Sequence, residues 1–330
     1  MRILFYSAKS YDREYFGQAN TAFGFEQTFM EARLDETTLS LCEGFDAVCV
    51  FVNDQLDAKV VHGLADRGVK IIALRCAGFN NVDLAAAGER QIKVVRVPAY
   101  SPEAVAEHAV ALILTLSRKT HKAYNRVREG NFSLERLTGF NLYQKTVGVI
   151  GTGKIGQAFC RIMLGFGCRV LAFDLYPNEE MKALGVEYRS FEEILPEVDI
   201  LSLHCPLTPD THHLLDEAAF AKIKQGATLI NTSRGALVDT KAVISALKHR
   251  KLRGLGIDVY EQEEHLFFRD LSETIIEDDQ IARLMSFPNV LVTAHQAFFT
   301  QEALTEIAQV SLQNLADWQA GKELPNEVKV

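Results

Sequence analysis

Short runs of apolar residues alternate with amphipathic stretches along almost the whole chain. The apolar runs predict strands of parallel sheets, and the stretches between them predict helices that cover those sheets. The predicted strands are 3–6, 47–51, 70–74 and 94–97 in the first part of the chain, and 146–150, 169–173, 199–203, 227–230, 255–257 and 290–292 in the second. The pattern therefore predicts an α/β protein with two parallel sheets.

Two longer helical stretches divide this alternation. Ser101, Pro102 and Glu103 have the residue types of a helix start and open a predicted helix that reaches about Arg128, either an interdomain or subunit-contact helix or one ordinary long helix. A second helix, over about 301–320, is expected to return to the first domain. We therefore expect a discontinuous first domain, residues 1–100 plus 299–330, and an inserted second domain, residues 101–298, both Rossmann-like or flavodoxin-like.

Composition narrows the class of protein. The 330 residues suit two domains, and the 48% hydrophobic content contains no run that approaches the roughly 18 apolar residues of a membrane helix. The net charge of −8 is spread along the chain without a basic block, which disfavours nucleic acid as a partner. The amino-terminal segment is typical of a first strand and not of a signal peptide, so a cytoplasmic location is expected.

Neither disulfides nor a metal site are expected. The six cysteines include no C-x-x-C pair and lie mostly in apolar runs, which is typical of reduced, buried thiols. His212 and His213 are adjacent and lack the i, i+4 spacing of helical ligands, so a surface role is favoured over metal binding.

A glycine fingerprint points to a dinucleotide. Gly151, Gly153 and Gly156 follow the predicted strand 146–150 directly and open a helix, which is the context in which G-x-G-x-x-G binds a pyrophosphate. Asp174 ends the next strand about twenty residues later, where a carboxylate binds the adenine ribose hydroxyls and would repel a 2′-phosphate. We therefore expect NAD rather than NADP.

Two side chains suited to reducing a 2-oxo acid follow later strands. Arg234 lies just past strand 227–230, and its planar fork suits a carboxylate and can polarise an adjacent carbonyl. His295 lies just past strand 290–292, and an imidazole is the side chain best able to protonate an alkoxide near neutral pH. Both are expected at the carboxyl edge of the sheet, where such folds bind ligands.

A proton-donating histidine needs a carboxylate on its far nitrogen, which orients the ring and raises its pKa. The acidic run after strand 255–257 offers Glu263, with Glu261 and Glu264 as competitors. The spacing alone does not choose among the three.

Together these motifs resemble the D-isomer-specific 2-hydroxyacid dehydrogenases over nearly the whole chain. The resemblance includes Asp258 five residues before Glu263 and Thr293 two residues before His295. Within that family, segments 75–83, 97–102 and 295–298 are similar to the fermentative D-lactate dehydrogenase branch.

The resemblance implies roles for individual residues. Arg234 would bind the substrate carboxylate and carbonyl, His295 would donate the proton, and Glu263 would hold the histidine. The amides of Ala77 and Gly78 would meet the carboxylate, and Phe51, Tyr100 and Phe298 would lie near the substrate's side chain. Besides the three glycines and Asp174, the cofactor contacts that the resemblance implies are Lys154, Ile155, Cys205, Pro206, Thr211, Thr232 and Asp258.

The resemblance also implies the reaction, which is reduction of pyruvate to D-lactate by NADH in a homodimer or homotetramer. The D stereochemistry comes from the resemblance alone. Phe51 stands where some family members carry Tyr, so bulkier 2-oxo acids such as phenylpyruvate remain an alternative substrate class. An NAD-sensing corepressor-type binding protein is the alternative outside enzymes.

Overall fold

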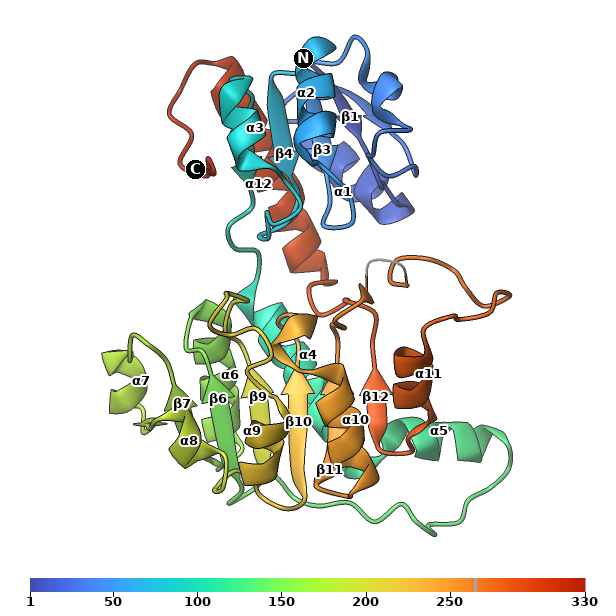
Figure 1. Cartoon of the computed structure of the whole chain (residues 1–330), viewed down its shortest axis with the longest axis vertical. Helices are drawn as coiled ribbons and strands as arrows, with labels where there is room; N and C mark the ends of the chain where they lie inside the picture. The colour runs from blue at the N-terminus through green and yellow to red at the C-terminus, as the bar shows by residue number, and fades with distance from the viewer. Residues whose placement is uncertain (264–265, 330) are drawn as a thin grey trace. The chain divides into compact units, whose positions relative to one another are not determined.

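Two compact units make up the chain. The computed structural model describes residues 1–263 and 266–329. The first unit is formed by Met1–Ser101 and Phe298–Val330, and the second by Pro102–Ala297 (Figure 1). Each unit has its own parallel sheet with helices between successive strands, so the predicted α/β class with two parallel sheets is confirmed.

The sheet of the first unit has five parallel strands in the order β2-β1-β3-β4-β5, the flavodoxin-like arrangement. The strands are β1 (Arg2–Phe5), β2 (Glu26–Phe29), β3 (Ala47–Val50), β4 (Ile71–Leu74) and β5 (Lys93–Arg96). The helices are α1 (Ser10–Asn20), α2 (Ala58–Asp66), α3 (Leu84–Glu89) and α12 (Gln301–Gln319), with the 3-10 helix η1 (Leu39–Cys42). The last helix, α12, packs against α1 and against β4 and β5, which confirms its predicted return to this unit.

The second unit contains seven parallel strands in the order β12-β11-β10-β9-β6-β7-β8. The strands are β6 (Thr146–Ile150), β7 (Arg169–Phe173), β8 (Glu187–Tyr188), β9 (Ile200–Leu203), β10 (Ala227–Asn231), β11 (Leu252–Ile257) and β12 (Val290–Val292). The helices are α4 (Pro102–Arg118), α5 (Thr120–Arg128), α6 (Lys154–Gly165), α7 (Glu179–Ala183), α8 (Phe191–Ile194), α9 (Glu217–Lys222), α10 (Thr240–Lys248) and α11 (Asp279–Ser286), with the 3-10 helix η2 (Gly235–Leu237).

Two hydrophobic cores sandwich this seven-stranded sheet. On one face, α6 packs on β6 and β7 while α4 packs on β10, β11 and β12, and their core includes Val147 and Val170. On the other face, α8, α9, α10 and α11 bury residues such as Leu247 against Leu229 and Leu255. Because both faces of the sheet are covered, its strands read as nearly continuous apolar runs.

Two strands escaped the sequence prediction. β2 carries three polar residues among four, and its side chains are all at least partly exposed, because it lies at the edge of its sheet. β8 has only two residues and also lies at a sheet edge. Neither segment has the apolar run that a buried strand needs.

The predicted single helix to about Arg128 was wrong. Lys119 has φ 54°, a left-handed backbone conformation that ends α4 and starts α5 in a new direction. The helix does begin at Pro102, as predicted.

The structure also bears on the cysteines and on membrane helices. All six cysteines are free and buried, as the sequence predicted. Among the described residues, no helix is both long and apolar enough to cross a bilayer.

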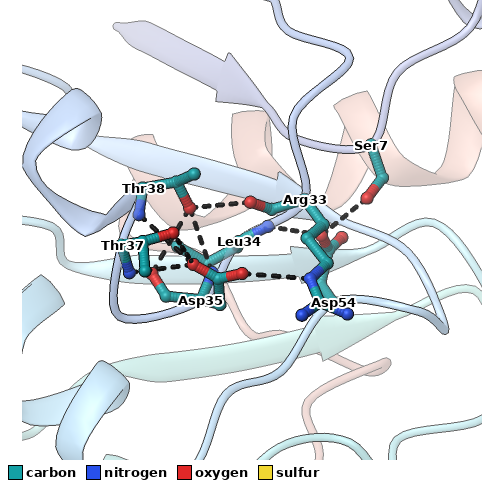
Figure 2. A network of polar contacts seen from close by, with 7 residues as sticks. All are labelled: Ser7, Arg33, Leu34, Asp35, Thr37, Thr38 and Asp54. Carbon is teal, nitrogen blue, oxygen red and sulfur yellow. Dashed lines mark hydrogen bonds and ion pairs between the residues drawn. The ribbon is translucent and has the colours of Figure 1, made fainter.

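A buried carboxylate organises the strand ends of the first unit. Asp54 is 1% exposed and accepts hydrogen bonds from Ser7 Oγ and Leu34 N, both at 2.7 Å (Figure 2). It also accepts one from Phe51 N at 2.6 Å. These donors follow β1, β2 and β3. Asp54 therefore fixes the loop that presents Phe51. Burial raises the pKa of Asp54, against the opposing effect of nearby Arg75.

We predict that Asp54→Ala destabilises the protein by about 3 kcal/mol or more, because three buried donors lose their acceptor. Asp35→Ala is the matched control, since Asp35 belongs to the neighbouring polar cluster in Figure 2 but lies near the surface and serves a local turn. Its loss is expected to cost about 1 kcal/mol. Urea denaturation of both variants measures the difference, and equal costs would contradict the assigned role of Asp54.

Candidate active site

The predicted site residues of the second unit follow six strands, including β7, whose end is followed by Asp174. Neighbouring strands of this sheet run parallel, so their carboxyl ends share one edge. The residues that follow these ends are Gly151 after β6, Cys205 after β9, Thr232 and Arg234 after β10, Asp258 and Glu263 after β11, and His295 after β12. The sheet thus gathers side chains that are up to 144 residues apart, from Gly151 to His295, at a single edge.

Two of the three glycines of the fingerprint leave no room for a side chain. Gly151 has φ +94°, and a Cβ there would stand 2.6 Å from Cys205 N. A Cβ on Gly156 would stand 2.0 Å from the carbonyl oxygen of Gly151. A Cβ on Gly153 would meet nothing within 4 Å, so its backbone is open to a ligand. Lys154 and Ile155 follow as the first residues of α6, whose free amides suit a phosphate.

Asp174 is joined to this turn. Its Oδ2 accepts hydrogen bonds from Thr152 N at 2.6 Å and Thr152 Oγ1 at 3.0 Å, and its Oδ1 accepts one from Tyr176 N at 2.8 Å. The carboxylate is therefore held beside the fingerprint, as binding to an adenine ribose requires.

Of the remaining predicted cofactor contacts, Thr232 carries a buried hydroxyl. Thr232 is 7% exposed, and within the part of the chain that the structure describes its Oγ1 has no hydrogen-bond partner. Such an atom costs about 1–3 kcal/mol unless a ligand satisfies it. Burial raises the pKa of Cys205 to about 11, so this thiol is neutral. Thr211 Oγ1 donates to Pro206 O at 2.7 Å and closes the loop after Cys205. These features fit a dinucleotide.

His295 and Glu263 form a direct pair. His295 Nδ1 lies 2.8 Å from Glu263 Oε1, and Glu263 Oε2 accepts a hydrogen bond from Tyr260 N at 2.8 Å. The carboxylate is thus fixed at both oxygens. Because the carboxylate accepts a hydrogen bond from Nδ1–H, the other ring nitrogen, Nε2, is left for chemistry.

The backbone of His295 is held in an unusual conformation. Its φ of 51° lies in the left-handed region, and its N–H donates to Asp258 O at 2.7 Å. The Asp258 carboxylate accepts from Thr293 Oγ1 at 2.5 Å, Gln296 N at 2.9 Å and Ala297 N at 2.8 Å. Burial opposes ionisation of Asp258, but these hydrogen bonds and one from His108 lower its pKa below the usual value.

The competing glutamates are separated by their contacts. Glu261 Oε1 lies 2.6 Å from His213 Nε2, and Glu261 Oε2 accepts from Thr240 Oγ1 at 2.8 Å. Its carboxylate is thus engaged away from His295. Glu264 lies outside the described residues. Of the described glutamates in this run, Glu263 makes the contact with His295.

Arg234 stands on a loop that packs tightly against the strand end carrying Glu263. A Cβ on the next residue, Gly235, would stand 2.1 Å from the carbonyl carbon of Tyr260, so the two loops touch through their backbones. Asn231 Nδ2 donates to Arg234 O at 2.8 Å and shapes the turn. The guanidinium is half-buried and donates to Ser233 O at 2.8 Å, with its remaining N–H groups available to a ligand.

The sequence analysis missed His108. Its Nε2 lies 3.0 Å from Thr293 Oγ1 and 3.4 Å from Asp258 Oδ1. Helix α4 thus stabilises, through His108, the two residues that hold the loop of His295. A signal was present, because His108 is a polar residue four positions from both Ala104 and Leu112 on the buried stripe of α4.

The predicted substrate residues of the first unit form an aromatic cluster. The Phe298 ring lies 5.9 Å from the Phe51 ring and 6.1 Å from the Tyr100 ring, measured between centroids. The guanidinium of Arg75, 2% exposed, stacks 5.1 Å from the centre of the Phe51 ring.

Ala77 and Gly78 follow β4 at the carboxyl edge of the smaller sheet. Their carbonyl oxygens are engaged, since Ala77 O accepts from Arg96 NH1 at 2.8 Å and Gly78 O accepts from Cys76 Sγ at 3.3 Å. These contacts fix the loop from its carbonyl side.

Comparison with known proteins places the chain in a family. The sequence pattern of "D-isomer specific 2-hydroxyacid dehydrogenase, NAD binding domain" matches residues 110–297. The D-lactate dehydrogenase of Escherichia coli is 56% identical over 99% of this chain and 100% of its own length. Its apo structure has a TM-score of 0.92 at 54% identity and covers 99% of this chain and 100% of that one.

Two further structures are similar over nearly the full length of both chains. The pyruvate reductase of Chlamydomonas reinhardtii has a TM-score of 0.94 at 46% identity and covers 99% of this chain and 98% of that one. A D-lactate dehydrogenase with NAD⁺ from Lactobacillus jensenii has a TM-score of 0.84 at 32% identity and covers 100% of each chain. The chain belongs to the D-isomer specific 2-hydroxyacid dehydrogenase family.

Family membership confirms the predicted resemblance. It also decides between enzyme and corepressor-type binding protein, because the similar proteins named above are dehydrogenases and a reductase. This 2-hydroxyacid dehydrogenase is an NAD-dependent oxidoreductase.

We predict that Gly156→Ala weakens NADH binding to the dehydrogenase roughly tenfold or more, because the new methyl group would push the start of α6 away from Gly151. Gly165→Ala is the matched control on the same helix, where a Cβ meets nothing within 4 Å. That control is expected to keep NADH affinity and to gain up to about 1 kcal/mol of stability. Fluorescence titration with NADH measures both, and equal affinities would contradict the close-packing argument.

Proposed function

We propose that this dehydrogenase reduces pyruvate to D-lactate with NADH. The observation that carries the proposal is the 2.8 Å bond between His295 Nδ1 and Glu263, at the sheet edge that also bears Arg234 and the glycine turn. A similar protein bears the name pyruvate reductase and two others the name D-lactate dehydrogenase, which supports this substrate.

Arg234 binds the substrate carboxylate in this proposal. Its planar fork offers two parallel N–H groups to the carboxylate and places positive charge near the neighbouring carbonyl. As the carbonyl carbon accepts hydride, negative charge grows on its oxygen, and the guanidinium stabilises that charge.

His295 supplies the proton. In reduction, Nε2–H protonates the carbonyl oxygen as it becomes a hydroxyl, and in the reverse direction neutral Nε2 accepts that proton. Glu263 holds Nδ1–H, fixes the ring orientation and stabilises the imidazolium form. The left-handed backbone of His295, held by Asp258, directs the ring.

The residues that would hold the cofactor are those with open or unsatisfied groups. Gly153 and the first turn of α6 would bind the pyrophosphate, Asp174 the adenine ribose and Thr232 Oγ1 a polar group of the nucleotide. When bound, NADH supplies the hydride. Asp174 favours NAD over NADP because its carboxylate would repel a 2′-phosphate.

We assign the substrate side to the first unit, with a substrate domain of residues 1–100 plus 299–330 and an NAD-binding domain of residues 101–298. The amides of Ala77 and Gly78 would contact the carboxylate, and Phe51, Tyr100 and Phe298 would limit the substrate's side chain. Three rings around one position favour a methyl group. Phe51 stands where some family members carry Tyr, so bulkier 2-oxo acids are the second candidate class of substrate. A homodimer or homotetramer stays a prediction.

The decisive experiment measures NADH consumption by the purified protein with pyruvate, 2-oxobutyrate, 2-oxoisocaproate and phenylpyruvate, followed by chiral analysis of the products. We expect the highest kcat/KM with pyruvate, and D-lactate as the product. A higher kcat/KM with phenylpyruvate would favour the bulky-substrate alternative, and L-lactate would refute the stereochemical assignment.

We predict that Glu263→Gln and His295→Ala each lower kcat by about 10²-fold or more, because the proton donor is lost or no longer held as an imidazolium. Glu261→Gln is the matched control, since Glu261 contacts His213 and Thr240 instead. It should keep turnover within a few-fold of the wild type. Steady-state kinetics with pyruvate across pH 5–9 measures this, and a control as slow as Glu263→Gln would refute the assignment.

A further inference from the structure

A basic pocket lies in the second unit at the sheet edge opposite Arg234 and His295. It has a volume of about 690 Å³ and reaches the first residues of β10 and β11 and the end of α4. Its lining includes five lysine and arginine side chains and one histidine: Lys119, Lys122, Arg126, Arg136, Arg253 and His121. Burial and the charge of Lys122 lower the pKa of His121, so the five other side chains carry the positive charge. No described lining residue is an aspartate or glutamate. This gathering is unexpected in a chain of net charge −8.

The break between α4 and α5 creates the pocket. Lys119, in its left-handed conformation, turns α5 away from α4, and the segment after α5 folds back across the gap. Lys119 Nζ donates to Arg136 O at 2.8 Å, and Arg126 NH1 donates to Glu135 O at 2.6 Å. Backbone carbonyls of the segment after α5 therefore hold two of these cations in place.

These charges are not balanced within the protein. Across residues 1–263 and 266–329, none of the six side chains forms an ion pair with a carboxylate. Lys122 Nζ donates to Pro288 O, and the Arg253 guanidinium lies over the Phe140 ring. Burial and the charges of Lys119 and Arg126 lower the pKa of Lys122.

Exposed cations elsewhere in this chain can be neutralised by acids that lie beside them. Arg169, for example, lies 2.7 Å from both Glu187 and Glu197. Mutual repulsion of like charges in a partly enclosed space is unfavourable, and an anion that enters would relieve it. We propose that this pocket binds a small anion with two or more negative charges, of the phosphate-ester or polycarboxylate class.

The location separates this pocket from the nucleotide site. Its residues Thr228 and Gly254 lie near the amino ends of β10 and β11, whereas the glycine turn follows the carboxyl end of β6. An anion in the basic pocket should therefore bind together with NADH. A volume of several hundred Å³ suits a small molecule rather than a nucleic-acid strand.

The test titrates pyrophosphate, and in a second arm citrate, into the NADH-saturated protein by isothermal calorimetry at constant ionic strength. We expect saturable binding of at least one of the two anions at one site per chain, and the stronger arm identifies the phosphate or the carboxylate class. The absence of saturable binding in both arms would overturn the proposal. Binding of an anion to the protein without NADH but not to the NADH-saturated protein would also overturn it.

Lys122→Gln and Arg136→Gln should each weaken the binding roughly tenfold, because each removes one charge-assisted contact. Arg136 is exposed, so its replacement leaves the fold intact. Lys248→Gln, an exposed cation on α10, is the matched control and should bind as the wild type does. Equal affinity in all three variants would overturn the proposal.

A second copy of this chain is the rival occupant of the pocket. Sedimentation of the same variants distinguishes it. If Lys122→Gln and Arg136→Gln change the oligomeric state while neither anion binds the wild type, the pocket is an interface between copies and the proposal is wrong.

Discussion

The buried carboxylate of Asp258 is the constraint on which the catalytic geometry depends. The carboxylate accepts hydrogen bonds from Thr293 Oγ1 and from the amides of Gln296 and Ala297. The main-chain carbonyl of Asp258 accepts a further hydrogen bond from the amide of His295. Four bonds from one residue thus hold a loop whose central histidine has a left-handed backbone. A loop without these bonds would relax toward the ordinary φ range and turn the imidazole away from Glu263.

Parallel pairing explains why so few anchors suffice. Glu263 and His295 follow neighbouring strands, β11 and β12, whose register is set by the sheet itself. Arg234 follows β10, the next strand, and Gly235 lets its loop touch the backbone after β11. The fold places three loops side by side, and local hydrogen bonds then need only to orient each side chain.

Much of this arrangement could be predicted, because buried parallel strands leave apolar runs and the chemistry follows directly after them. The glycine turn, Arg234 and His295 are found in this way. The features that could not be predicted depend on contacts between residues that are far apart in sequence, or on backbone conformations that the residue type does not reveal. The edge strands β2 and β8 lack apolar runs. The left-handed residue that ends α4 is Lys119 and not a glycine, so the sequence does not mark this helix end. Glu263 differs from Glu261 only through hydrogen-bond partners that are far away in sequence.

Satisfied and unsatisfied polar groups divide the molecule into scaffold and binding surface. Asp54 and Asp258 are almost fully buried, and each accepts at least three hydrogen bonds, so they stabilise loops and have little capacity for a ligand. Thr232 Oγ1 is equally inaccessible to bulk water but lacks a partner among the described residues. Because leaving a buried donor unpaired is unfavourable, such an atom persists where binding of another molecule completes it. The cations around Lys122 differ from Thr232, because several of them donate to backbone carbonyls. What they lack among the described residues is a carboxylate, so a bound anion would balance their charge rather than complete their hydrogen bonds.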